Sequence, residues 1–144
     1  SSLPRAAIWA VVKAATWALV SAANAASLVS TNSKVVGVSI SDSAANIASN
    51  FNSLQSIGGS KLTAISVSDD ARVNLTYSQW ANNPKPLDAL HTAGADIGVT
   101  GVTVARLGEV VADTAVEAIT LADTTANIQA NLASVLRNAS HITA

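Results

Sequence analysis

The stretch VSISDSAANIASNFNS at residues 38–53 decides the fold, because the chain repeats it as ITLADTTANIQANLAS at residues 119–134. A shift of 81 positions aligns residues 22–57 with residues 103–138 without a gap. Self-similarity at a fixed period is typical of repeat architectures. The sequence therefore predicts an internal duplication, with one full unit of about 81 residues and part of a second.

Each copy of the repeated stretch predicts a strand that leads into a helix. Apolar residues alternate with other residues over 35–41 and again over 116–122, which is the pattern of a strand. Asp42 and Asp123 come directly after these strands. Carboxylates at such positions accept hydrogen bonds from the free N–H groups of a helix start, so we predict that both residues are helix caps.

The helices that follow share one apolar face and one polar feature. The apolar positions have the spacing i, i+4, i+7 in both copies, at Ile47, Phe51 and Leu54 and at Ile128, Leu132 and Val135. Beside this face each copy carries two asparagines one turn apart, at Asn46 and Asn50 and at Asn127 and Asn131. Asparagine is a poor helix former. One hypothesis is that these amides bond between units, and the alternative is that they are ordinary solvated positions.

The rest of the chain alternates between strand and helix signals. We expect a strand within 61–70 that ends in a turn, and a short strand at 72–77 that continues it as a strand pair. A helix within 78–93 is interrupted at NNPKP, and it is followed by a strand at 97–104 and a short helix at 105–112. Strands separated by helical crossovers pair in parallel. The predicted fold class is α/β, a stacked, solenoid-like strand–helix repeat, which we prefer to a closed Rossmann-type sheet.

The first 29 residues form a separate region in this interpretation. They predict one long apolar helix from Pro4 to about Val29, while residues 30–144 form a single α/β repeat domain. Lys13 interrupts the apolar run, which argues against a signal peptide, and two cations argue against a membrane span. A helix that is apolar over most of its circumference must be buried on more than one side. It is either an internal core helix or an assembly helix.

The assembly alternative places an interface at both ends of the chain. Its predicted residues are Ile8, Trp9, Val12, Trp17, Leu19, His141 and Ile142. His141 and Ile142 belong to HITA at residues 141–144, which matches KLTA at residues 61–64 and predicts the start of a further strand.

Composition limits the function classes. Charged residues make up 12% of the chain, the net charge is −1 and cysteine is absent. A surface with so little charge repels other copies weakly, and it offers no basic field to nucleic acid. The absence of cysteine excludes disulfides and thiolate metal sites.

No pattern of residues predicts catalysis. His91 and His141 have no acidic partner at a metal-ligand spacing, and SIGGSK at 56–61 follows a helix, whereas a phosphate loop would open one. Asp69 and Asp70 predict a turn more readily than a calcium site. We therefore expect no enzyme, no cofactor and no metal.

The pattern D-[ST]-x-A-N-I-x-x-N-[FL], matched at 42–51 and 123–132, resembles a repeat of long secreted proteobacterial proteins known as adhesin-like or calcium-binding-like. The resemblance covers roughly residues 22–144. It implies an extracellular or cell-surface setting and a non-catalytic role. The chain departs from these proteins in its short length and in its tryptophan-bearing N-terminal segment.

These observations lead to two hypotheses on function. The first is an extracellular structural protein whose partners are copies of itself, joined head-to-tail into a filament, surface layer or matrix. The alternative is an adhesin segment that binds cell-surface glycans, with Tyr77 and Trp80 near Asn82 and Asn83 as the contact patch. Neither hypothesis includes nucleic acid or a transmembrane span.

Overall fold

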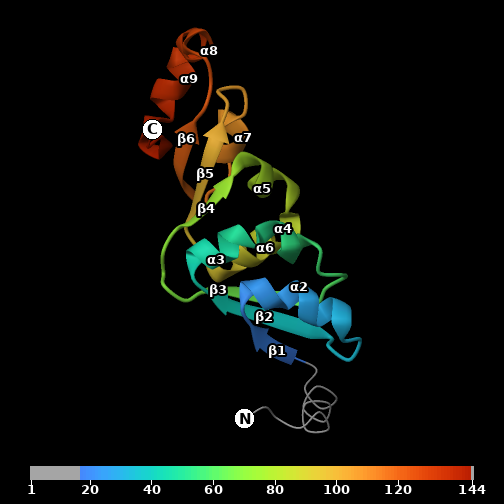
Figure 1. Ribbon diagram of the computed structural model, residues 1–144. Coiled ribbons are helices and arrows are strands. Elements are labelled where there is room, and N and C mark those ends of the chain that lie inside the picture. Colours follow the sequence, from blue (N-terminus) through green and yellow to red (C-terminus); the bar gives the residue numbers. More distant parts are fainter. Residues whose placement is uncertain (1–16, 144) are drawn as a thin grey trace.

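The computed structural model describes residues 17–143, which form an elongated α/β molecule (Figure 1). Two three-stranded sheets make up its frame, and their strands are neighbours in chain order. The first sheet contains β1 (Trp17–Val20), β2 (Gly37–Asp42) and β3 (Leu62–Val67), and the second contains β4 (Val73–Thr76), β5 (Ile97–Val102) and β6 (Val116–Leu121). Every neighbouring pair is parallel, as the sequence predicts for strands joined by helices.

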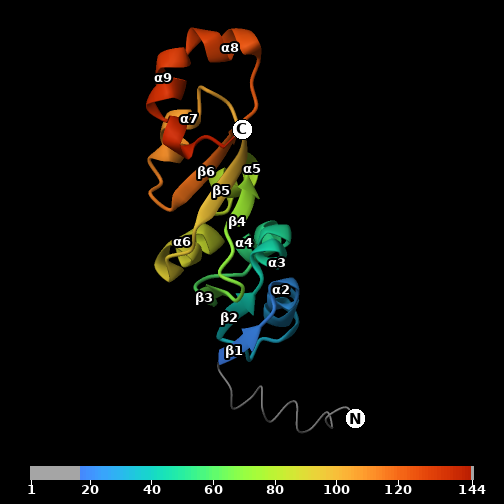
Figure 2. The ribbon, with the colours of Figure 1, turned by 90° about the vertical axis from the view of Figure 1, so that its left-hand side faces the viewer.

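Helices connect the strands and pack beside the sheets (Figure 2). The helices are α2 (Ala22–Thr31), α3 (Ala44–Ser49), α4 (Phe51–Gln55), α5 (Tyr77–Asn82), α6 (Pro84–Ala93), α7 (Leu107–Val111), α8 (Thr125–Ala130) and α9 (Leu132–Arg137), with a 3₁₀ turn at Ala139–His141. β1 lies at one end of the molecule, and α8 and α9 lie at the other. The two ends of the described chain are therefore far from each other.

The prediction of one helix from Pro4 to Val29 is wrong in its second half. Residues 17–20 form strand β1, and the helix begins only at Ala22. The backbone of β1 pairs with β2 from Trp17 opposite Gly37 to Val20 opposite Ile40. Trp, Leu and Val favour strands when a neighbouring strand is available, and this long-range pairing outweighs the local helical pattern. Residues 1–16 lie outside the described residues.

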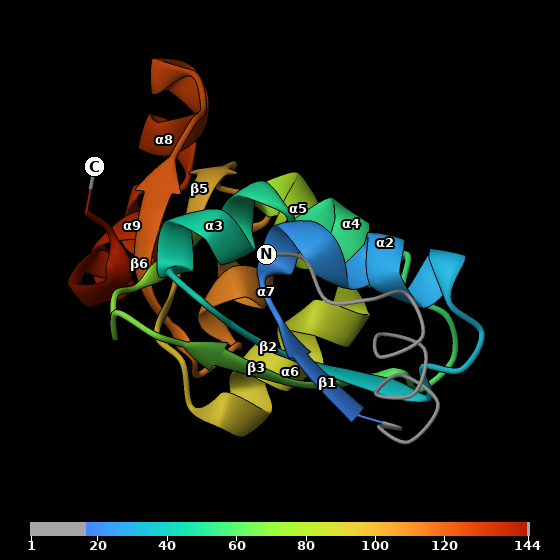
Figure 3. The same ribbon diagram turned by 60° about the horizontal axis from the view of Figure 1, so that its bottom comes forward.

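The expected strand pair within 61–77 is also wrong, because β3 and β4 belong to different sheets. Residues 68–72 separate the two strands, and Asp70 there adopts a positive φ of 50°. Such a backbone conformation turns the chain sharply. The sheets consequently point in different directions (Figure 3).

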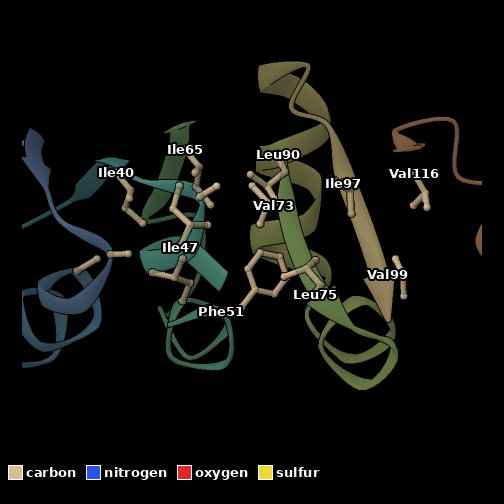
Figure 4. Close-up of a cluster of buried hydrophobic side chains, with 14 of the residues drawn as sticks. Ile40, Ile47, Phe51, Ile65, Val73, Leu75, Leu90, Ile97, Val99 and Val116 are labelled. Carbon is tan, nitrogen blue, oxygen red and sulfur yellow. The ribbon is translucent and has the colours of Figure 1, made fainter. Parts of the chain in front are cut away.

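A continuous apolar core joins the two sheets. Ile47, Phe51 and Leu54, the predicted apolar face of the first copy, are fully buried. Figure 4 shows Phe51 between the β2–β3 side and the β4–β5 side of this core. The interior consists mainly of Ile, Val, Leu and Ala. Phe51, the single phenylalanine of the sequence, also belongs to it. Small branched side chains suit thin helices packed closely on short strands.

The duplication in the sequence is also a duplication in structure. In the first copy, Val38 of β2 lies opposite Leu62 of β3. In the second copy, Ile119 of β6 forms a parallel bridge with Ile142. These residue pairs are equivalent in the alignment, including its one-residue deletion after the repeat. Ile142 therefore occupies the place at which the counterpart of β3 begins.

Candidate functional site

Asp42 and Asp123 connect neighbouring strand–helix units. One oxygen of Asp42 accepts a hydrogen bond from the Ala22 N–H (3.0 Å), beyond the end of β1, and the other accepts from the Ser43 N–H (2.8 Å). Asp123 accepts in the same way from the Val104 N–H (3.0 Å) and the Thr124 N–H (2.8 Å). Each carboxylate thus joins the carboxyl ends of two adjacent parallel strands.

The helix caps lie one residue later than predicted. The Ser43 hydroxyl accepts from the Asn46 N–H, and the Thr124 hydroxyl accepts from the Asn127 N–H. Ser and Thr are good N-cap residues. Asp42 and Asp123 precede the caps and are free to bond to the neighbouring unit.

Asp69, which lies in a turn as the sequence predicts, makes a third link of this kind. Its Oδ1 accepts from the Ala44 N–H (3.1 Å), beyond the end of β2, and from the Ala71 N–H (3.3 Å). Each of β2, β3 and β6 therefore has a carboxylate at its carboxyl end or just beyond it, which bonds to the preceding unit.

The four repeated asparagines bond within their own units. Asn46 and Asn127 donate to Asp42 Oδ1 (2.8 Å) and Asp123 Oδ1 (2.6 Å). Asn50 and Asn131 donate to the carbonyl oxygens of Asn46 (2.8 Å) and Asn127 (2.9 Å). Within the described chain these four amides therefore do not bond between units, as one hypothesis had it. Each amide instead finds an acceptor four residues earlier in its own unit.

These amide bonds also act on the carboxylates. The Asn46 amide, followed by the N–H groups of Ala22 and Ser43, lowers the pKa of Asp42 below its usual value. Asn127, followed by Val104 and Thr124, lowers the pKa of Asp123 in the same way. Hydrogen bonds to the ionised form favour it. Both copies therefore hold a charged carboxylate at the same structural position.

The apolar helix faces differ sharply between the two copies. Ile47, Phe51 and Leu54 are fully buried in the first copy, where β4 packs on α3 and where α2 and α6 pack on α4. In the second copy Leu132 is 49% exposed and Leu136 is 65% exposed. Ile128 and Val135 are half-buried beside them. We call these four residues the α8–α9 face.

The sequence carried one signal for this face. Leu132 aligns with buried Phe51, so the repeat alone predicts a core residue there. Leu136, however, aligns with the polar Gln55. This leucine in place of a glutamine makes the second face more apolar than the first.

The predicted assembly residues that the structure describes lie at opposite ends of the molecule. Leu19 on β1 is 73% exposed, and β1 is the first strand of its sheet. His141 and Ile142 are half-buried at the other end, next to α9. The backbone of Trp17 pairs with β2, and Ile8, Trp9 and Val12 lie outside the described residues. Among the described residues, Leu19 is therefore far from His141 and Ile142 within one chain, and only a contact between copies could bring them together.

A pocket of about 770 Å³ lies beside Trp80. The Trp80 indole N–H donates to Asp113 Oδ2 (2.8 Å), and His91 Nε2 lies 2.9 Å from the same oxygen. Asp96 and Glu117 also line the pocket. The arrangement joins α5, α6 and the segment before β6, and it leaves part of the Trp80 side chain exposed.

The other members of the predicted glycan patch bond elsewhere. Tyr77 donates to Glu109, and this hydrogen bond raises the pKa of the Tyr77 phenol. Asn83 is buried and donates to Asn52 Oδ1 (2.8 Å), while Asn82 donates to the Ser78 carbonyl (2.8 Å). Both asparagines support α5 and its junction with α6. Trp80 is the residue of the patch that lines the pocket.

Residues 17–143 contain neither a cluster of metal ligands nor a helix that could span a membrane. Within that range no group of three or more His, Asp or Glu side chains could hold a metal ion. None of its helices combines the length and apolar character needed to cross a membrane.

Comparisons with family models, curated proteins and solved structures found no match to this chain.

Proposed function

We propose that this protein is an extracellular structural protein that self-associates head-to-tail. The α8–α9 face of one copy is covered by a second copy of the same chain. The observation that carries the proposal is the exposure of Leu132 and Leu136 on a face whose apolar counterparts in the first copy, Ile47, Phe51 and Leu54, are fully buried. Complete burial of one leucine contributes about 1.5–3 kcal/mol, so covering both favours association.

A second copy is the natural occupant because the chain already carries a segment that covers such a face. Following the first copy, β4 packs on α3 and α6 packs on α4. The second copy has the same backbone pattern and the same Asp and Asn bonds. A surface built on the same plan fits a covering segment of the same kind.

The contact would join two different surfaces, one near each end of the molecule. Such heterologous contacts form open assemblies when they do not close into a ring. A stack of strand–helix units that continues from one copy to the next is a solenoid in this proposal. It would produce a filament, or a layer or matrix built from filaments.

The non-catalytic, extracellular part of the proposal rests on the sequence. Only 12% of the residues are charged, which limits electrostatic repulsion between copies. The repeated pattern resembles secreted proteobacterial surface proteins.

Sedimentation velocity over a range of protein concentrations, combined with electron microscopy, tests the proposal. We expect species that grow with concentration and appear as elongated assemblies. A single monomeric species at the highest concentration would overturn self-association.

The pocket beside Trp80 favours a second candidate, a glycan-binding adhesin segment. Its volume falls in the range of small-ligand sites, and an aromatic ring lines it together with Asp96 and Glu117. A glycan array with the native chain and with Trp80→Ala tests this candidate. It requires binding that the folded variant loses, and the absence of binding by the native chain would refute it.

A further inference from the structure

The contact between α6 and α4 shows how this chain covers an apolar helix face. α6 packs against both α4 and β3 (Figure 1), and its Leu90 is fully buried. Two side-chain bonds join the helices in addition to the apolar packing. The Lys85 N–H donates to Gln55 Oε1 (2.9 Å), and Asn83 donates to Asn52 Oδ1 (2.8 Å).

The shift of 81 positions also relates α6 to the start of the chain. β5 follows α6, and β1 is the counterpart of β5, since Trp17 pairs with Gly37 as Gly98 pairs with Ala118. Continued without a gap, the same shift aligns α6 with residues 3–12. Trp9 then takes the position of Leu90, and Ile8 and Val12 take the positions of Ala89 and Ala93.

We propose that residues 3–12 of a second copy dock on α9 and Ile142 as α6 docks on α4 and β3 within the chain. This inference rests on the proposed function and names the segment and the register of the contact. Within one chain, β1, to which this segment leads, lies at the end of the molecule opposite α9. In this proposal a second copy supplies the segment.

Paired substitutions support this register. Leu136 takes the place of Gln55, so the side-chain oxygen that accepts the hydrogen bond is lost. Pro4 takes the place of Lys85 and has no backbone N–H to donate. A polar pair is thus replaced on both sides by an apolar pair. Neither partner is left with a buried polar group that lacks a hydrogen bond.

The second bond of the α4–α6 contact changes in the same concerted way. Asn52 corresponds to Ala133, and Asn83 corresponds to Ser2. The acceptor amide and the donor amide are both absent at the corresponding positions. The contact between copies is consequently more apolar than the contact within the chain.

Volume is exchanged across the proposed contact. Phe51 and Leu90 belong to one core cluster on two helices that pack together. Their counterparts are Leu132 and Trp9, so the smaller side chain on one surface meets the larger one on the other. Trp9 is the expected anchor of the interface, as aromatic residues often are.

Intermolecular disulfide formation tests this register, since the chain has no cysteine of its own. Pro4→Cys and Leu136→Cys are prepared as separate full-length variants, mixed and oxidised mildly. Within the chain the Lys85 N–H lies 2.9 Å from Gln55 Oε1, so the proposed register places positions 4 and 136 next to each other across the contact. The matched control is Pro4→Cys with Ala126→Cys, because Ala126 corresponds to Ala45, which is exposed beside a covered face.

We expect the 4–136 heterodimer to exceed the 4–126 heterodimer about tenfold, because disulfides form only between closely placed backbones. Equal yields from a mixture that still forms large species would overturn the proposed register and leave self-association standing. Equal yields from a mixture that stays monomeric would overturn both.

Discussion

The two copies of the repeat have nearly the same local structure and opposite surroundings. Asp42 and Asp123 accept equivalent hydrogen bonds, and Ser43 and Thr124 cap equivalent helices. Yet the apolar face is buried on α3 and α4 and half exposed on α8 and α9. The backbone pattern is therefore set by residues within each unit, whereas burial depends on what packs against it.

The largest expected difference between the copies concerns stability. Phe51→Ala should lower the free energy of unfolding by about 3–5 kcal/mol, because it opens a cavity in a closed core. Leu132→Ala at the equivalent position should cost about 1 kcal/mol or less, since the side chain is already half exposed. Urea denaturation at a protein concentration too low for association measures both. Equal losses would show that the two faces do not differ in solution.

The next effect concerns association. Leu136→Asp should weaken self-association about tenfold or more, because docking would bury a charge without a partner. Sedimentation velocity measures this change. Ala126→Asp is the control, because this exposed position should stay exposed after assembly, and it should leave association unchanged. Similar effects of both variants would indicate that charge in general, and not the α8–α9 face, controls association.

The smallest expected effect concerns the hydrogen-bonded aspartates, Asp42 and Asp123, which the two copies share. Hydrogen bonds lower the folded-state pKa of Asp42 and Asp123, so each carboxylate stabilises the fold above the unfolded pKa of about 3.9. This stabilisation is lost as the pH falls through the lower, folded-state pKa. The urea midpoint should therefore decrease in acid, and Asp42→Asn and Asp123→Asn should each flatten that decrease. Unchanged acid sensitivity in both variants would contradict the linkage.

The sequence predicted the elements that depend on local chemistry. The strand expected at 116–122 is β6 (Val116–Leu121), and the NNPKP break separates α5 from α6. The mixed α/β class and the parallel strands are confirmed. Alternating apolar residues and a proline are local signals, and they need no knowledge of the partner elements.

The predictions of secondary structure and strand pairing were wrong where contacts between residues distant in the sequence determine the structure. Trp17 to Val20 lie in an Ala-rich stretch that suits a helix, and only pairing with β2 makes them a strand. The turn at Asp70 sends β4 into a second sheet, which no periodicity in β3 or β4 indicates. The exposure of Leu132 could not be predicted from a repeat in which its counterpart is buried. Leu136 in place of Gln55 was the available signal.

Hydrogen exchange as a function of protein concentration tests most directly whether a second copy covers the α8–α9 face. Backbone amides of α9 should exchange more slowly as concentration rises, because docking protects them. Amides of α4, already covered within the chain, should exchange at the same rate throughout. If large species form while the exchange of α9 amides stays constant, or if α4 slows as much as α9, the proposed contact is wrong.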